Sequence, residues 1–327
     1  MKARAKVSAR KGQHRISASL PTGTPSRLGR RSGKAPAGLD TPWDPNPRFE
    51  QEVHFCGYDH RVATVGEAGA ELYWERSGSG EPLLLIQGMS GTHLSWGRPF
   101  LSRLEADFDC VVFDNRGIGN SADTAEPFTI ADLAADALAV MDAAGFETAH
   151  VLGISMGGMT AQELALAAPE RLRTLTLGCT YPGGTGSSLL DPADAQTLLE
   201  AMASGKLDTV FRAMYEINLS PDFRAEESRY ADFTAMASAL PARQATVQLQ
   251  MQAVIGHDAQ ARLAEIAAPT LVIHGTADKM IPVANGELIA SLIPGARLEL
   301  LEGVGHMFWW EQPERSAELI RTHALGA

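Results

Sequence analysis

A single serine stands between two glycines in the segment GISMG, residues 153–157. Apolar residues lead into this segment and helically spaced residues follow it, so Ser155 lies where a buried strand must turn sharply into a helix. A serine hydroxyl becomes a good nucleophile only when a base removes its proton and preset donors receive the oxyanion. Glycines permit the crowded turn, and the helix N-terminus offers unpaired amides near the hydroxyl. The segment therefore predicts a nucleophilic serine at residue 155.

An acid and a histidine follow Ser155 in the order that this chemistry requires. Asp278 comes just after the strand-like run PTLVIHG, and His306 comes just after the run ARLELLEG. The carboxyl ends of parallel strands meet at one edge of an open sheet, where ligands gather. We predict that His306 is the base and that Asp278 holds its imidazole in one tautomer. Either residue alone is equally typical of an ordinary loop, but their joint position and order favour the catalytic interpretation.

Two backbone amides are expected to receive the oxyanion. One belongs to Met156, the residue after the predicted nucleophile. The other belongs to the loop after the strand-like run 83–86, and Met89 is the expected donor. The set is complete without a metal or an organic cofactor, so we predict neither.

Short apolar runs alternate with amphipathic stretches along most of the chain, which is typical of parallel strands covered by helices on both faces. The predicted strands are 70–78, 82–88, 109–117, 149–155, 172–178, 269–275 and 296–303, and the predicted helices are 129–145, 156–168, 283–292 and 312–324. This pattern predicts an α/β fold with a doubly wound, mostly parallel sheet. Between residues 181 and 266 the pattern gives way to helical segments rich in Met and aromatic residues, which predicts a helical cap inserted into a core formed by 51–180 and 267–327.

Charge is distributed unevenly along the chain. The first 39 residues hold ten of the 28 Lys and Arg residues and no acidic residue. The remainder of the chain therefore holds 18 basic residues and all 39 acidic residues. We interpret residues 1–50 as a basic, disordered arm. The acidic body argues against a nucleic-acid partner for the folded part.

The expected partner is a small molecule, and a homo-oligomer is left open. No apolar run reaches the roughly 18 residues of a membrane span, and the N-terminus lacks the apolar core of a secretory signal. The three cysteines, Cys56, Cys110 and Cys179, have neither paired nor metal-like spacing, so we expect reduced thiols. These features predict a cytoplasmic protein.

Several segments together resemble the α/β-hydrolase superfamily, over residues 55–325. The matching segments are LIQGMSG, FDNRGIGNS, HVLGISMGGMTAQELALAAPERLRTLTL, PTLVIHGTADKMIPVANGE and EGVGHMFWWEQPE. Within the superfamily they look like the branch of 3-oxoadipate enol-lactonases, small esterases and cofactor-free haloperoxidases or perhydrolases. The family's loop usually begins His-Gly, whereas this chain has Gln87 and Gly88. We expect the Gln87 amide to orient the loop in place of the histidine.

The resemblance implies a serine hydrolase that cleaves a small or medium carboxylic ester or lactone through an acyl-enzyme. Dehalogenases and epoxide hydrolases of this fold carry an aspartate where this chain has Ser155, so they fit less well. Two alternatives stay open: a carbon–carbon bond hydrolase of the same fold, and a noncatalytic ligand-binding member.

Overall fold

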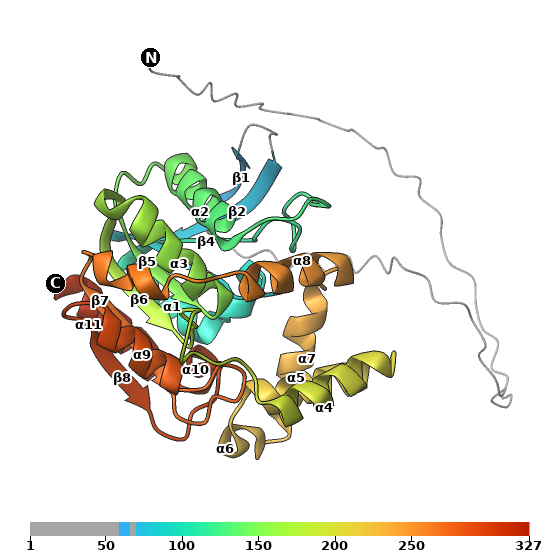
Figure 1. Cartoon of the computed structure of the whole chain (residues 1–327). Coiled ribbons are helices and arrows are strands. Elements are labelled where there is room, and N and C mark those ends of the chain that lie inside the picture. The colour runs from blue at the N-terminus through green and yellow to red at the C-terminus, as the bar shows by residue number, and fades with distance from the viewer. Residues whose placement is uncertain (1–58, 66–69, 327) are drawn as a thin grey trace, which may run out of the picture. The chain divides into compact units, whose positions relative to one another are not determined.

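The computed structural model describes residues 59–65 and 70–326, and Figure 1 shows their arrangement. Eight strands form one sheet in the order β1-β2-β4-β3-β5-β6-β7-β8. The six strands β4, β3, β5, β6, β7 and β8 run parallel to one another. β2 pairs antiparallel with β4, and β1 pairs antiparallel with β2 at the edge of the sheet. The bounds are β1 (Asp59–Val65), β2 (Ala70–Gly78), β3 (Glu81–Ile86), β4 (Phe108–Phe113), β5 (Ala149–Ile154), β6 (Leu172–Gly178), β7 (Thr270–Gly275) and β8 (Arg297–Leu301).

The predicted doubly wound, mostly parallel sheet is therefore confirmed. β1 was not predicted. The predicted strand 109–117 ends earlier, at Phe113, because the residues after it form a turn in which Gly117 has a φ of 73°. The predicted basic arm and Cys56 lie outside the described residues.

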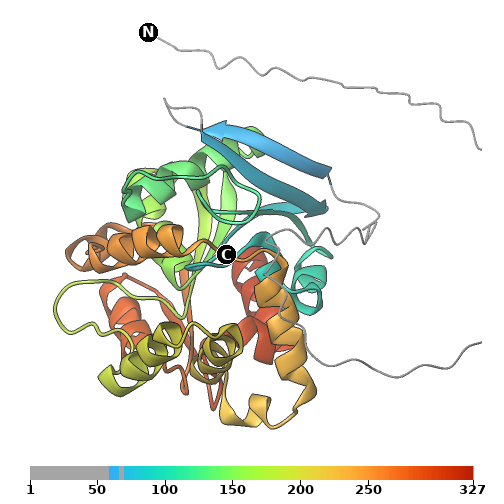
Figure 2. The ribbon, with the colours of Figure 1, turned by 90° about the vertical axis from the view of Figure 1, so that its right-hand side faces the viewer.

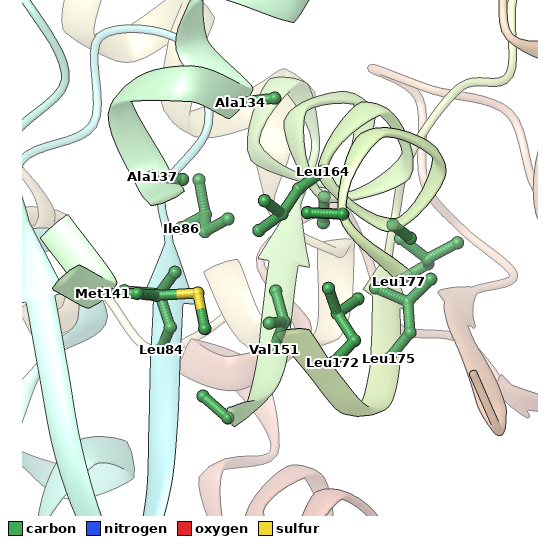
Figure 3. Close-up of a cluster of buried hydrophobic side chains, with 14 of the residues drawn as sticks. Leu84, Ile86, Ala134, Ala137, Met141, Val151, Leu164, Leu172, Leu175 and Leu177 are labelled. Carbon is green, nitrogen blue, oxygen red and sulfur yellow. The ribbon is translucent and has the colours of Figure 1, made fainter. Parts of the chain in front are cut away.

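Helices cover both faces of the sheet. α2 (Ile130–Ala144), α3 (Met156–Ala167) and α9 (Ala284–Leu292) pack on one face, and α1 (Arg98–Leu104) and α11 (Pro313–Leu325) pack on the other. Successive strand residues point to opposite faces, so Leu84 and Ile86 join the first layer while Leu83 and Leu85 join the second. Figure 3 shows Leu84, Ile86 and Met141 packed together in the first layer. Burial on both faces explains why these strands are apolar throughout.

A group of helices lies between β6 and β7, and we call residues 192–255 the cap. It comprises α4 (Pro192–Ala203), α5 (Leu207–Asn218), α6 (Pro221–Arg224), α7 (Ser228–Ala239) and α8 (Gln244–Ile255). Figure 1 shows these helices to the right of the sheet, and Figure 2 views the same helices from that side. No helix in the described part of the chain combines the length and the apolar character needed to cross a membrane.

The turn from β5 into α3 is tightly packed against β3. Ser155 forms the turn with a φ of 53° and a ψ of −125°, a conformation that residues with a side chain rarely adopt. A Cβ atom on Gly157 would lie 2.1 Å from the carbonyl oxygen of Ile86, and one on Gly153 would lie 2.2 Å from the oxygen of Gly157. Both flanking glycines are therefore required by close backbone approach.

Replacing Gly157 tests this packing. We expect Gly157→Ala to lower the free energy of unfolding by about 1–3 kcal/mol, because the new methyl group must displace backbone and not a flexible side chain. Urea titration followed by circular dichroism measures the change. Gly256→Ala is the matched control, since the nearest atom to its Cβ is 3.4 Å away. Equal stability of the two variants would contradict the interpretation.

Candidate active site

The loops after β7 and β8 bring Asp278 and His306 together. Nδ1 of His306 lies 2.8 Å from Oδ2 of Asp278, and both side chains are buried. The backbone N–H of Ile281 donates to the other carboxylate oxygen at 2.9 Å. An imidazole that donates from Nδ1 to a carboxylate carries its lone pair on Nε2. The pair predicted from chain order is thus in direct contact, with the geometry of an oriented base.

A second histidine also touches the same carboxylate. Nε2 of the fully buried His274 lies 2.8 Å from the carbonyl oxygen of Ile281 and 3.3 Å from Oδ2 of Asp278. His274 was not among the residues singled out from the sequence. Burial by itself would raise the pKa of Asp278, but the charges and hydrogen bonds of His306 and His274 outweigh it and hold that pKa below its usual value. The carboxylate therefore stays ionised.

Cys179 connects this pair to Ser155. Its sulfur, a carboxylate oxygen of Asp278 and a ring nitrogen of His306 lie within 4.8 Å of one another. Burial raises the pKa of the Cys179 thiol, the charge of Asp278 adds to this, and a hydrogen bond from the Ser155 backbone opposes it. The three predicted residues therefore gather around one buried thiol. A thiol that stays protonated is a poor metal ligand, so this cluster is a weak candidate for a metal site.

The loop after β3, residues 87–93, lies directly against the predicted nucleophile. We call it the β3 loop. A Cβ atom on Gly88 would be 2.9 Å from Cβ and 3.4 Å from Oγ of Ser155. The N–H of Gly88 donates to Oε1 of the neighbouring Gln87 at 3.2 Å, while Nε2 of Gln87 has no partner among the described residues, so the expected orienting role of this amide stays a prediction. This contact brings the β3 loop within reach of anything bound at Ser155.

The two predicted oxyanion donors have free amides. Met156 is the first residue of α3, a position whose N–H has no acceptor within the helix. Among the described residues, neither the Met89 nor the Met156 N–H donates a hydrogen bond. Their side chains belong to one apolar cluster with Leu249 and Met280. Both amides are therefore available to a ligand.

The cap reaches the β3 loop through a residue that sequence reasoning missed. Oε1 of Gln250, on α8, accepts the N–H of Ser90 at 2.9 Å. Gln250 is fully buried, and its Nε2 has no partner among the described residues. Ser90 follows Met89 and has a φ of 59°, so the bond holds an unusual backbone conformation next to a predicted donor. Nothing in the sequence distinguishes Gln250 from the other glutamines of residues 244–255.

A buried charge cluster holds the far end of the β3 loop. The backbone N–H of His93 donates to Oδ1 of Asp114 at 2.6 Å, and its Nδ1 lies 2.9 Å from the same oxygen. Nε2 lies 3.3 Å from Glu75, whose carboxylate accepts the hydroxyl of Tyr73. Burial by itself lowers the pKa of His93, but the hydrogen bond to Asp114 and the charges of Asp114 and Glu75 outweigh it and raise that pKa. The imidazolium form thus ties the loop to β2 and to the turn after β4.

Comparison with known proteins gives the family of the chain. The family model of the α/β hydrolase fold matches residues 81–313. The chain belongs to the α/β-hydrolase family. It is 32% identical over 273 residues to rhodomycin D methylesterase DnrP of Streptomyces peucetius, covering 75% of this chain and 91% of that protein. It is 26% identical over 262 residues to 3-oxoadipate enol-lactonase 1 of Acinetobacter baylyi, covering 80% and 96%.

A solved structure extends the likeness to three dimensions. A hydrolase from Pseudomonas aeruginosa matches with a TM-score of 0.70 and 30% identity, over 82% of this chain and 99% of that chain. This α/β hydrolase therefore has relatives that hydrolyse esters and lactones. The family predicted from the sequence motifs is confirmed.

The hold of the cap on the β3 loop is testable by hydrogen exchange. Gln250→Leu keeps the side-chain volume but removes the acceptor of the Ser90 N–H. Losing one buried hydrogen bond costs about 1–3 kcal/mol, so exchange of a peptide covering 87–93 should accelerate by roughly 5-fold to 150-fold. Mass spectrometry measures this rate. Gln252→Leu, at an exposed position of the same helix, should leave the peptide unchanged, and equal rates in both variants would count against the contact.

The charge cluster predicts a pH dependence of stability. Because the pKa of His93 is raised above 6.5, its charge stabilises the fold below pH 6.5, and this stabilisation is lost as the pH rises through the folded-state pKa. The difference in unfolding free energy between the wild type and His93→Gln should therefore narrow from pH 6 towards about pH 9. Urea titrations across that range provide the measurement. A constant difference would show that the His93 charge has no such role.

Proposed function

We propose that this α/β hydrolase cleaves a small or medium carboxylic ester or lactone through an acyl-enzyme on Ser155. The observation that carries the proposal is the hydrogen bond between His306 and Asp278, 2.8 Å long, beside the Cys179 thiol to which the Ser155 backbone is bonded. It leaves Nε2 of His306 as the acceptor for the serine proton. The methylesterase and enol-lactonase among the relatives are named for reactions of the same class.

In the proposed first step, Oγ of Ser155 attacks the carbonyl carbon while Nε2 of His306 takes its proton. The oxyanion accepts hydrogen bonds from the amides of Met89 and Met156, and the imidazolium is balanced by Asp278. Collapse breaks the bond to the alcohol oxygen, which receives the proton from His306. Water, deprotonated by the same histidine, then attacks the acyl-enzyme. Collapse breaks the bond between the acyl carbon and Oγ of Ser155, which takes the proton back from His306 as the carboxylic acid leaves.

The surroundings of the two predicted oxyanion donors favour an apolar group on the substrate. The side chains of Met89 and Met156 pack in a cluster with Leu249, Met280 and Tyr181. Burying apolar substrate surface against such side chains stabilises binding by about 25 cal/mol per Å². We therefore expect uncharged esters with a butyl to octyl acyl chain to be better substrates than acetyl esters.

The nucleophile is tested by labelling and by turnover. A fluorophosphonate should form an adduct on Ser155, identified by peptide mass mapping, and p-nitrophenyl esters should be hydrolysed. Ser155→Ala should lose both the adduct and turnover while keeping its circular dichroism spectrum. Ser291→Ala, at an exposed serine of α9, is the control and should retain both. Wild-type hydrolysis by a folded Ser155→Ala protein would disprove the mechanism.

The role of the acid is tested separately. Asp278→Asn should lower kcat by about 10³-fold to 10⁴-fold, because the amide cannot hold the required tautomer of His306. Asp232→Asn, on an exposed part of α7, should match the wild type.

Labelling of Ser155 without ester turnover would favour the carbon–carbon hydrolase, to be assayed with a vinylogous diketone. Absence of both labelling and turnover would favour the noncatalytic ligand-binding alternative.

A further inference from the structure

We propose that Glu311 is a positioning residue that couples the cap to His306. Glu311 ends the short helix α10 (Phe308–Glu311) and follows His306 by five positions. The proposal rests on the proposed function, in which His306 is the base. It goes beyond that function by making the placement of the base depend on the cap.

The Glu311 carboxylate joins two segments that are far apart in the chain. Oε1 accepts the backbone N–H of Gly305 at 3.0 Å and the backbone N–H of Ser220 at 2.8 Å. Oε2 accepts the hydroxyl of Ser220 at 2.5 Å. Gly305 immediately precedes His306, and Ser220 lies in the cap at the start of α6. One side chain therefore bonds both the cap and the residue next to the predicted base.

The residue after His306 is held by the same part of the cap. The N–H of Met307 donates to the carbonyl oxygen of Asn218 at 3.1 Å. His306 is therefore flanked on both sides by backbone groups whose partners are Glu311 and the cap segment 218–220. A shift of that segment must be transmitted to the backbone at His306, because both flanking bonds would stretch.

Gly305 packs tightly between Glu311 and the cap. A Cβ atom on Gly305 would lie 2.8 Å from Oε1 of Glu311, 2.9 Å from the oxygen of Asn218 and 2.9 Å from the nitrogen of Ser220. Glycine is thus the residue that allows the loop before His306 to meet Glu311 and the cap this closely. Gly305, Glu311 and the cap segment 218–220 are therefore in close packing contact.

Burial makes these bonds matter. Burial raises the pKa of Glu311 above its usual value, and the hydrogen bonds from Ser220 and Gly305 and the charge of Arg229 offset only part of this shift. Asp222 and Glu302 line a surface hollow that Glu311 also lines. All three donors find acceptors on this carboxyl group, and removing it would leave them without partners. An apolar residue at 311 should therefore loosen the loop that carries His306, because it cannot accept these hydrogen bonds.

The first experiment compares Glu311→Leu with Glu311→Gln. Glu311→Leu removes every acceptor, and we expect kcat for p-nitrophenyl butyrate and the rate of fluorophosphonate labelling to fall about tenfold or more. Glu311→Gln keeps an oxygen for the two backbone donors, so it should stay within about threefold of the wild type. Glu302→Leu is the matched control, since Glu302 borders the same hollow but makes no hydrogen bond among the described residues.

A spectroscopic readout separates positioning from simple support of the fold. The proton between Nδ1 of His306 and Asp278 should give a downfield ¹H NMR resonance in the wild type. It should shift or broaden in Glu311→Leu and persist in Glu311→Gln and Glu302→Leu. An unchanged resonance and kcat in folded Glu311→Leu would overturn the proposal, as would a rise in KM alone.

A variant in the cap keeps the test decisive if Glu311→Leu does not fold. Ser220→Ala removes only the hydrogen bond to Oε2 of Glu311 and the bond from the Phe223 N–H to the Ser220 hydroxyl at the start of α6. The substitution changes neither His306 nor Asp278. We expect a two-fold to five-fold loss of kcat and a shift of the same resonance, and no change in either would overturn the proposal. If the wild type neither labels nor turns over, the proposed function fails, while the resonance still reports whether Glu311 positions His306.

Discussion

A carboxylate can stay ionised inside a protein only when donors surround it, and the arrangement of the candidate site follows from this constraint at Asp278. His306, His274 and the amide of Ile281 come from three positions around the ends of β7 and β8. Each satisfies part of the carboxylate, and each is oriented by it in return. The tautomer that leaves Nε2 of His306 free is thus a consequence of burying one negative charge.

The same site depends on backbone packing that only glycine allows. Gly157 lets α3 begin against β3, and Gly88 lets the β3 loop approach Ser155. These contacts bring β3 and its loop against the turn that carries Ser155, while the loops after β7 and β8 bring Asp278 and His306 together. The sheet therefore determines the distances, and the loops supply the functional groups.

The cap reaches both halves of this site by hydrogen bonds. Gln250 bonds the β3 loop, and Ser220 bonds Glu311 beside the histidine loop. A cap that only covered a substrate would need neither bond. Because both loops are held from the same group of helices, substitutions in the cap are expected to alter catalytic rate together with substrate preference.

The sequence alone determined the family and the mostly parallel sheet, and it predicted Ser155, Asp278 and His306 as a set. These are properties of local pattern and chain order: apolar runs mark buried strands, and strand ends mark the edge where the loops meet. Gln250, Glu311 and the second histidine at Asp278 were decided only by the tertiary structure. Each bonds a segment distant in the chain or a group oriented by folding, and no periodicity encodes which buried polar atom meets which partner. β1 escaped prediction for a related reason, since its position depends on pairing with β2 at the edge of the sheet.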